Sequence, residues 1–263
     1  MNLTRIGLLA AVVLSSGCWP FKGKRSDPAV PVVSNSPQVV DSLWQAGEQA
    51  FNQGRWGKAS ELFARLNGVM PVTDARINRM AFYRGEIELA RGNHLDAVRQ
   101  LRRLADEHPD DVLAADALLR AGDAYSYLWR RPELDPTYGQ TALAVYLEVQ
   151  SRYPNSTAAK RAEAKIRELQ DLFARKDYLS AVFYLKYKAY DSAVLMLRDL
   201  IARYPRSSVV PAALERLVSA YRALKYDEDV QETCEYIVQF HPDPDGPRKL
   251  CPATAATDST GQL

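Results

Sequence analysis

Apolar and polar residues follow a helical period through most of this chain, in blocks that each end at a proline. The block-ending residues are Pro71, Pro109, Pro154, Pro205 and Pro242. In four of these five blocks a compact or β-branched residue stands 24 positions before the proline, namely Gly47, Gly85, Ala181 and Val218. Because proline cannot continue a helix, each block predicts a helical segment that stops there.

Each block also has the same internal plan, two helices joined by a short polar turn. In the predicted second helix an apolar residue stands four positions after an alanine, as in the pairs Ala59 and Phe63, Ala97 and Leu101, and Ala193 and Leu197. Compact, aromatic and proline positions at this spacing are typical of tetratricopeptide repeats. The sequence therefore predicts an all-α fold, a tetratricopeptide-type helical-repeat solenoid of about five repeats, over residues 41–242. The repeats end near residues 71, 109, 154, 205 and 242.

The third block departs from this plan. Its compact residue, Gly122, stands 32 positions before Pro154, and the extra residues fall within 129–139, which contain two prolines and a glycine. We expect an inserted loop there, with helix resuming at Gln140. Residues 157–188 contain almost no helix breaker, so we expect one long helix that braces the two parts of the array.

The N-terminus predicts a targeting signal. Arg5 precedes an unbroken apolar stretch, Ile6 to Leu14, which is far shorter than the roughly 20 residues that span a bilayer. Residues 1–17 therefore predict a signal peptide. A small residue directly before Cys18 resembles the lipobox of bacterial lipoproteins, although Ser15 occupies the place of the usual leucine. That resemblance implies lipid attachment at Cys18; the alternative is a plain secretory signal followed by a chance cysteine.

The segments on either side of the repeats show no helical or strand period. Residues 18–40, which contain four Pro together with Ser, Asn, Lys and Val, predict a flexible tether behind the lipid anchor. Trp19 stands where an aspartate would retain a lipoprotein at the inner membrane, so we expect delivery to the outer membrane. Residues 243–263 begin with Asp-Pro-Asp-Gly-Pro and predict a disordered tail.

Composition and side-chain chemistry favour a binding protein over an enzyme. The 34 basic and 32 acidic residues give a net charge of +2, which provides no reason to expect nucleic acid as a partner. The three histidines lack metal-ligand spacing, and no phosphate loop or nucleophile motif occurs. We therefore expect no enzymatic activity, cofactor or metal. Cys234 predicts a buried thiol, and a disulfide with Cys251 stays open as an alternative.

The first three repeats contain the candidate binding residues. The position after the compact residue is acidic in each, and apolar or aromatic side chains stand nearby. These candidates are Trp44, Glu48, Phe51, Phe82, Glu86, Asp123 and Tyr127. One interpretation is a groove for a peptide with aromatic and basic features. The other is a row of solvated charges beside ordinary core aromatics.

Two of the predicted helices end in similar tyrosine-proline motifs. Residues 202–208 read Ala-Arg-Tyr-Pro-Arg-Ser-Ser, and residues 151–156 end the earlier block with a similar Tyr-Pro-Asn-Ser. With residues 177–186 and 189–194, these segments look like the C-terminal half of BamD lipoproteins, which belong to the machinery that assembles outer-membrane β-barrels. A lipobox cysteine, five repeats and an enlarged third repeat extend the resemblance over most of the chain.

The resemblance implies a scaffold that is lipid-anchored to the outer membrane and faces the periplasm. Its implied partners are the barrel-assembly subunit and unfolded outer-membrane proteins, with membrane contact through the lipid alone. We expect the C-terminal repeats to dock the folded subunit and the N-terminal repeats to receive the transient ligand. The alternative is another periplasmic repeat lipoprotein or adaptor, for instance one that coordinates the cell envelope or cell division.

Overall fold

A computed structural model describes residues 36–243 and 245–251. Within these ranges the chain forms ten α-helices and one 3₁₀ helix, with no strand. The elements are α1 (Pro37–Asn52), α2 (Trp56–Asn67), α3 (Ile77–Ala90), α4 (His94–Glu107), α5 (Ala114–Tyr127), α6 (Thr137–Arg152), α7 (Thr157–Lys186), α8 (Tyr190–Arg203), α9 (Val210–Leu224), α10 (Asp227–Phe240) and η1 (Pro247–Leu250).

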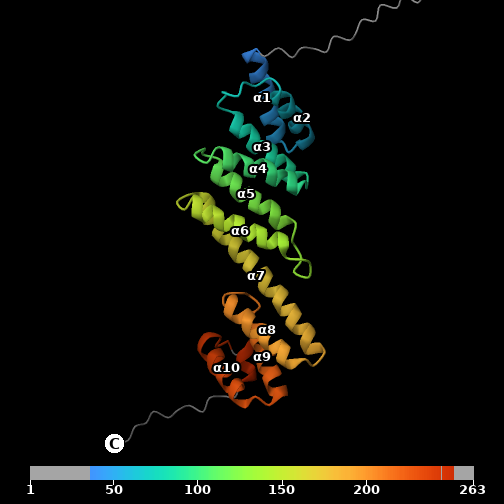
Figure 1. Cartoon of the computed structure of the whole chain (residues 1–263), viewed down its shortest axis with the longest axis vertical. Coiled ribbons are helices and arrows are strands. Elements are labelled where there is room, and N and C mark those ends of the chain that lie inside the picture. Colours follow the sequence, from blue (N-terminus) through green and yellow to red (C-terminus); the bar gives the residue numbers. More distant parts are fainter. Residues whose placement is uncertain (1–35, 244, 252–263) are drawn as a thin grey trace, which may run out of the picture. The chain divides into compact units, whose positions relative to one another are not determined.

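Each helix packs mainly on the helices directly before and after it in the sequence (Figure 1). Short turns join α1 to α2, α3 to α4, α7 to α8 and α9 to α10. Packing of sequential neighbours, repeated in this way, is the architecture of a helical-repeat solenoid. The predicted all-α tetratricopeptide-type fold is therefore confirmed.

The compact residues of the first three repeats lie where two helices approach closely. A Cβ atom built on Gly47 would lie 2.8 Å from Phe63 Cε1, and one on Gly85 would lie 2.4 Å from Leu101 Cγ. At Gly122 the corresponding distance, to Tyr146 Cε1, would be 2.6 Å. Glycine is thus required at these positions because no side chain fits in the helix crossing.

In four repeats, the turn between the paired helices contains a residue with a left-handed backbone conformation, seven positions after the compact residue. Its φ angle is +67° at Gly54, +80° at Gly92, +57° at Lys188 and +63° at Lys225. Glycine adopts this conformation without steric cost, whereas lysine does so with strain. The two ends of the array therefore use different residues in the same turn geometry.

Helix α7 belongs to two parts of the core. Its earlier buried residues, including Ile166 and Phe173, pack with α4, α5 and α6. From Ala174 onward its buried residues pack with α8 and α9 instead. The predicted long helix is thus shared between consecutive groups of repeats, which explains why it spans 30 residues.

Three expected boundaries differ from the observed ones. Helix α1 begins at Pro37 rather than residue 41, since proline fits the first turn of a helix, where its missing N–H is not needed. Helix α6 begins at Thr137 rather than Gln140, and the Asp135 side chain accepts a hydrogen bond from the Thr137 backbone N–H. The inserted loop also contributes to the core, because Trp129 is fully buried against Phe173 and Gly139.

The third difference concerns the C-terminal segment. Residues 247–250 form η1 instead of a disordered start to the tail, and Cys251 is joined to Cys234 of α10 by a disulfide. The predicted signal peptide, Cys18 and most of the predicted tether lie outside the described residues.

Candidate peptide-binding groove

Two adjoining pockets lie over α3, α5 and the first half of α7. One, of about 410 Å³, is lined by residues of the first three repeats: Phe51, Trp56, Glu86, Leu89, Ala90, His94, Arg120, Tyr127 and Arg130. The other, of about 670 Å³, extends to α7 and includes Asp123, Trp129, Tyr146, Arg161, Lys165 and Glu168. Arg120, Tyr127 and Arg130 line both, so we treat the two pockets as one groove, called the N-terminal groove below.

Arg120 joins two of the predicted acidic residues at the floor of this groove. Its Nε and Nη2 atoms donate to the two carboxylate oxygens of Glu86, at 2.6 and 2.8 Å. Its Nη1 donates to Asp123 Oδ2 at 2.7 Å. All three side chains are largely buried, and hydrogen bonding to Glu86 raises the pKa of the guanidinium above its ordinary value. The groove floor is therefore a closed charge network rather than a free acidic row.

Asp123 has a second, buried partner. The Tyr146 hydroxyl donates to Asp123 Oδ1 at 2.8 Å. Burial, together with the nearby Asp123 charge, raises the pKa of Tyr146, so its hydroxyl stays protonated and continues to donate. Since the Tyr146 ring also packs on Gly122, this bond ties the groove floor to the crossing of α5 and α6.

Acidic residues form hydrogen bonds between consecutive repeats at equivalent positions. Tyr83 donates its hydroxyl to Glu48 at 3.1 Å, as Arg120 donates to Glu86. Both donors stand two positions before the compact residue of their own repeat. The acid of one repeat thus accepts a hydrogen bond from the equivalent position of the next, which stabilises the stacking of α1, α3 and α5.

The accessible part of the groove is aromatic and basic. Tyr127 is 41% exposed and stacks on His94 with ring centroids 5.3 Å apart. The Arg130 guanidinium lies 4.8 Å from the Tyr127 ring centroid. Among residues 36–243 and 245–251, Arg130 makes no ion pair, so its charge is available to a ligand.

Comparison with known proteins identifies the family of the chain. Residues 38–236 match the protein family YfiO, described as "Outer membrane lipoprotein". The chain belongs to this family of outer membrane lipoproteins. Curated relatives named "Outer membrane protein assembly factor BamD" include one from Caulobacter vibrioides, 25% identical over 85% of this chain and 72% of its own length. Another, from Vibrio cholerae, is 25% identical over 80% of this chain and 92% of its own length.

Solved structures with a similar helical arrangement are more distant. The complex titled "TPR2AB-domain:pHSP90-complex of yeast Sti1" has a TM-score of 0.43 at 14% identity, covering 79% of each chain. A tetratricopeptide repeat protein of Thermus thermophilus has a TM-score of 0.36 at 16% identity, covering 78% of this chain and 92% of its own.

The structure separates the predicted groove residues of this family member into two groups. Phe51, Glu86, Asp123 and Tyr127 line the N-terminal groove. The other three belong to the packing of the repeats. Trp44 is buried beside Phe63 and Tyr83, Glu48 accepts from Tyr83, and Phe82 packs against the core cluster of α4 to α7.

Sequence reasoning missed the basic residues of the groove. Arg120 could have been found, because it stands at the same register as Tyr83, two positions before the compact residue. Arg130 lies in the loop of the third repeat, where no periodic pattern fixes its place. Lys165 is the third omission: its hydrogen bond to Glu168 raises its pKa, and the charge of Asp123 contributes further.

Two further findings bound the chemistry of the described residues. No group of three or more His, Cys, Asp or Glu side chains in these ranges is arranged to hold a metal ion. None of the helices of the described ranges combines the length and apolar character that a membrane crossing requires.

Proposed function

We propose that this chain is a lipid-anchored periplasmic scaffold for the assembly of outer membrane proteins. The match of residues 38–236 to the outer membrane lipoprotein family carries the proposal, and the relatives named as outer membrane protein assembly factors give its direction. The helical-repeat architecture supports a role in binding proteins rather than in catalysis, because stacked repeats provide extended binding surfaces.

The scaffold is held at the membrane by lipid on Cys18. The short apolar stretch before Cys18 and the family description support this anchor. Several acyl chains on one residue hold a protein firmly, whereas one chain binds only marginally. We expect Cys18→Ser to move the protein from the membrane fraction to the soluble periplasmic fraction. Unchanged fractionation, with no acyl mass on the wild-type N-terminus, would contradict the anchor.

The N-terminal groove receives an extended segment of an unfolded client. Accessible aromatic area at Tyr127 and Trp56 supports this assignment, since rigid aromatic side chains supply most of the affinity in such contacts. A free acidic row would favour basic clients. We do not propose that preference, because Glu86 and Asp123 are bound by Arg120. The available charge of Arg130 favours a client segment with aromatic and acidic groups.

The C-terminal repeats dock the folded partner, the barrel-assembly subunit. Leu179, Phe183 and Tyr187 stand four positions apart on α7 and in the turn after it, and they are 39%, 55% and 66% exposed. The rings of Phe183 and Tyr187 lie 4.8 Å apart. An exposed apolar stripe of this kind is typical of a protein-binding surface, which supports docking here.

Co-purification from detergent-solubilised membranes tests this function. We expect wild-type chain to retrieve the barrel-assembly subunit, identified by mass spectrometry. A Phe183→Ala/Tyr187→Ala variant should retrieve at least tenfold less, because exposed aromatic anchors typically contribute more than 1 kcal/mol each. Tyr127→Ala serves as the matched control, because it removes an exposed aromatic side chain outside the docking surface. If wild type retrieves no barrel-assembly subunit, an adaptor of another envelope process replaces this proposal.

A further inference from the structure

The end of the repeat array is covered by a short segment of the chain. In the preceding repeats, the outer side of each second helix packs on the first helix of the next repeat, as α4 does on α5 and α8 on α9. Helix α10 has no such successor in the described ranges. Its neighbours there are α9 and η1, and η1 also packs on α9. Within the segment 245–251, η1 thus contacts both helices of the last repeat, at the end of the described array.

Three kinds of contact hold this segment in place. Pro247 is buried, and Leu250 and Cys251 pack against the core cluster of α7 to α10. Lys249 forms an ion pair with Glu215 of α9 at 3.1 Å, and Arg222 of α9 donates to the Leu250 carbonyl. The third contact is covalent, the disulfide that joins Cys251 to Cys234 of α10.

The non-covalent contacts are few. Segment 245–251 has one 3₁₀ turn, and the Lys249–Glu215 pair is exposed to solvent, where ion pairs contribute little. Ordering a short peptide costs conformational entropy, and a segment with a single turn buries little surface to offset that cost. The disulfide joins two cysteines with a sequence separation of 17, and the loop it closes restricts the conformations open to the detached segment.

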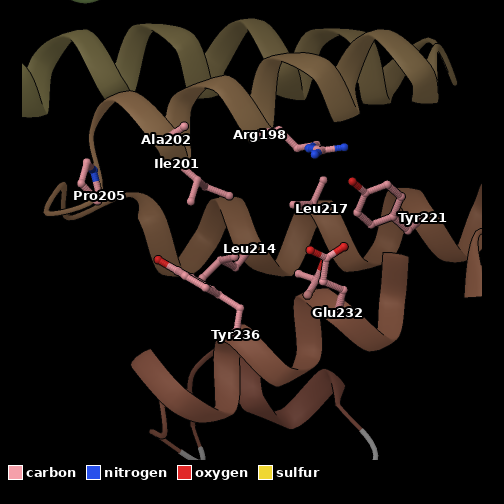
Figure 2. Close-up of a pocket in the computed structure, with 10 residues that line it drawn as sticks. Arg198, Ile201, Ala202, Pro205, Leu214, Leu217, Tyr221, Glu232 and Tyr236 are labelled. Carbon is pink, nitrogen blue, oxygen red and sulfur yellow. The ribbon is translucent and has the colours of Figure 1, made fainter. Parts of the chain in front are cut away.

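Helix α10 in turn forms one wall of the pocket shown in Figure 2. This pocket of about 360 Å³ lies among α8, α9 and α10. Glu232 and Tyr236 of α10 extend toward Leu214 and Leu217 of α9, and Arg198 of α8 lies on the opposite side (Figure 2). The position of α10, and with it this wall, therefore depends on what holds the outer side of the helix.

We propose that segment 245–251 is the C-terminal cap of the array, and that oxidation of Cys234 and Cys251 fastens it. The last repeat is then fully capped only after a disulfide-bearing oxidant has reacted with the two cysteines. This timing rests on the periplasmic location in the proposed function. Cys18, the remaining cysteine, is the expected lipid attachment site, which leaves Cys234 and Cys251 to pair with each other.

The chemistry is thiol–disulfide exchange. The thiolate of one cysteine attacks the disulfide of the oxidant, forms a mixed disulfide and releases one oxidant thiol. The second cysteine then attacks the mixed disulfide, which forms the Cys234–Cys251 bond and releases the other oxidant thiol. Two electrons and two protons pass from the chain to the oxidant, which leaves as a dithiol.

The test uses the full lipoprotein purified in detergent under non-reducing conditions. We expect Cys234 and Cys251 to resist alkylation until a reductant is added, and both to react afterwards. Reduction should accelerate amide hydrogen exchange in α10 by roughly a hundredfold, since the loop constraint is then lost. Exchange in α3 to α6 should not change, because these helices lie outside the last repeat.

Two variants separate the covalent link from the other contacts. Cys251→Ser should show the fast α10 exchange of the reduced protein while leaving Cys234 in the core, and Lys249→Ala should keep the slow exchange of wild type. Thiols that alkylate without reductant, or α10 exchange that is equal with and without the disulfide, would overturn the cap. If Cys251→Ser does not accumulate, the reduced wild type gives the same comparison. None of these measurements depends on a partner, so their failure is distinct from failure of the proposed function.

Discussion

The first three repeats and the last two share one backbone plan but are stabilised by different interactions. Between equivalent helices of consecutive repeats in the first part, ion pairs recur, as in Arg120 with Glu86, Arg102 with Glu148 and Arg152 with Asp106. Among the described residues, the last part has fewer ion pairs between elements, Arg203 with Asp177 and Lys249 with Glu215, and it contains the disulfide of α10.

The difference also extends to backbone positions. Glycine occupies the close crossings and left-handed turns of the first repeats, whereas Ala181, Val218, Lys188 and Lys225 stand at the equivalent places later. The first part is thus specified by glycine geometry and charge pairing, and the last by bulkier packing and a covalent link. A groove whose acidic floor is already paired with Arg120 suits a transient ligand that meets mainly aromatic surface.

The largest expected effect concerns the close crossings. Gly85→Ala should lower the free energy of unfolding by about 3 kcal/mol, because the new methyl group would overlap Leu101. Gly57→Ala is the matched control, since nothing lies within 4 Å of a Cβ at that helical glycine, and it should change stability by less than about 0.5 kcal/mol. Urea unfolding followed by circular dichroism measures both. Equal effects of the two changes would show that the crossing is not tightly packed.

A smaller effect is expected from the groove floor. Arg120→Met should destabilise the chain by about 2 kcal/mol, because it leaves Glu86 and Asp123 partly buried without their cation. Arg130→Met should leave stability unchanged within about 0.5 kcal/mol, since Arg130 makes no ion pair in the described ranges. The same variant should weaken binding of an acidic aromatic peptide, measured by fluorescence anisotropy. A destabilised Arg130→Met would mean that both arginines are structural and that the groove has no free cation.

The left-handed turn residues of the two parts can be exchanged for one another by substitution. Gly92→Lys should destabilise by about 1 kcal/mol, because a lysine would take on the left-handed strain without gaining a contact. Lys225→Gly should stabilise by about 0.5 kcal/mol, since the relief of strain is partly offset by the greater freedom of glycine in the unfolded chain. Thermal unfolding of both variants tests this. Changes of the same sign would mean that the two turns are not equivalent.

The smallest expected effect is the pH dependence of stability that Asp74 contributes. Hydrogen bonds from Arg76 lower the pKa of Asp74, between α2 and α3, from its ordinary value of 3.8 to about 2. A lowered folded-state pKa stabilises the fold above pH 3.8, and this contribution is lost as the pH falls toward 2. Asp74→Asn should therefore lower the melting temperature by a degree or two at pH 6 and have no effect near pH 2. A pH-independent difference would contradict the ionic origin.

The sequence predicted the fold and much of its internal geometry. The compact positions Gly47, Gly85 and Gly122 were predicted from the repeat, and the structure places each against an apolar or aromatic residue of the paired helix. The candidate site was predicted less well. Charge at Glu86 and Asp123 was visible, but their shared partner, Arg120, stands one turn from Asp123 on α5 and on a different repeat from Glu86. Its bond to Glu86 becomes apparent only once the helices are stacked.

Segments without a period were the hardest to predict. The position of Trp129 depends on a loop that folds back onto Phe173 and Gly139, which no local pattern encodes. The C-terminal cap was hidden for a related reason. Its composition, rich in proline and polar residues, indicates disorder by itself, and its order comes from Cys234, Glu215 and Arg222 on α9 and α10.

The central claim, that the N-terminal groove receives clients while the C-terminal repeats dock a folded subunit, can be tested by site-specific photocrosslinking in cells. A photoreactive residue at Tyr127 should crosslink to unfolded outer-membrane precursors, and one at Phe183 should crosslink to the barrel-assembly subunit. Val112, which is 89% exposed between α4 and α5, provides the background. Precursor at Phe183 and subunit at Tyr127 would contradict the division, and background-level crosslinking at Tyr127 would contradict the groove.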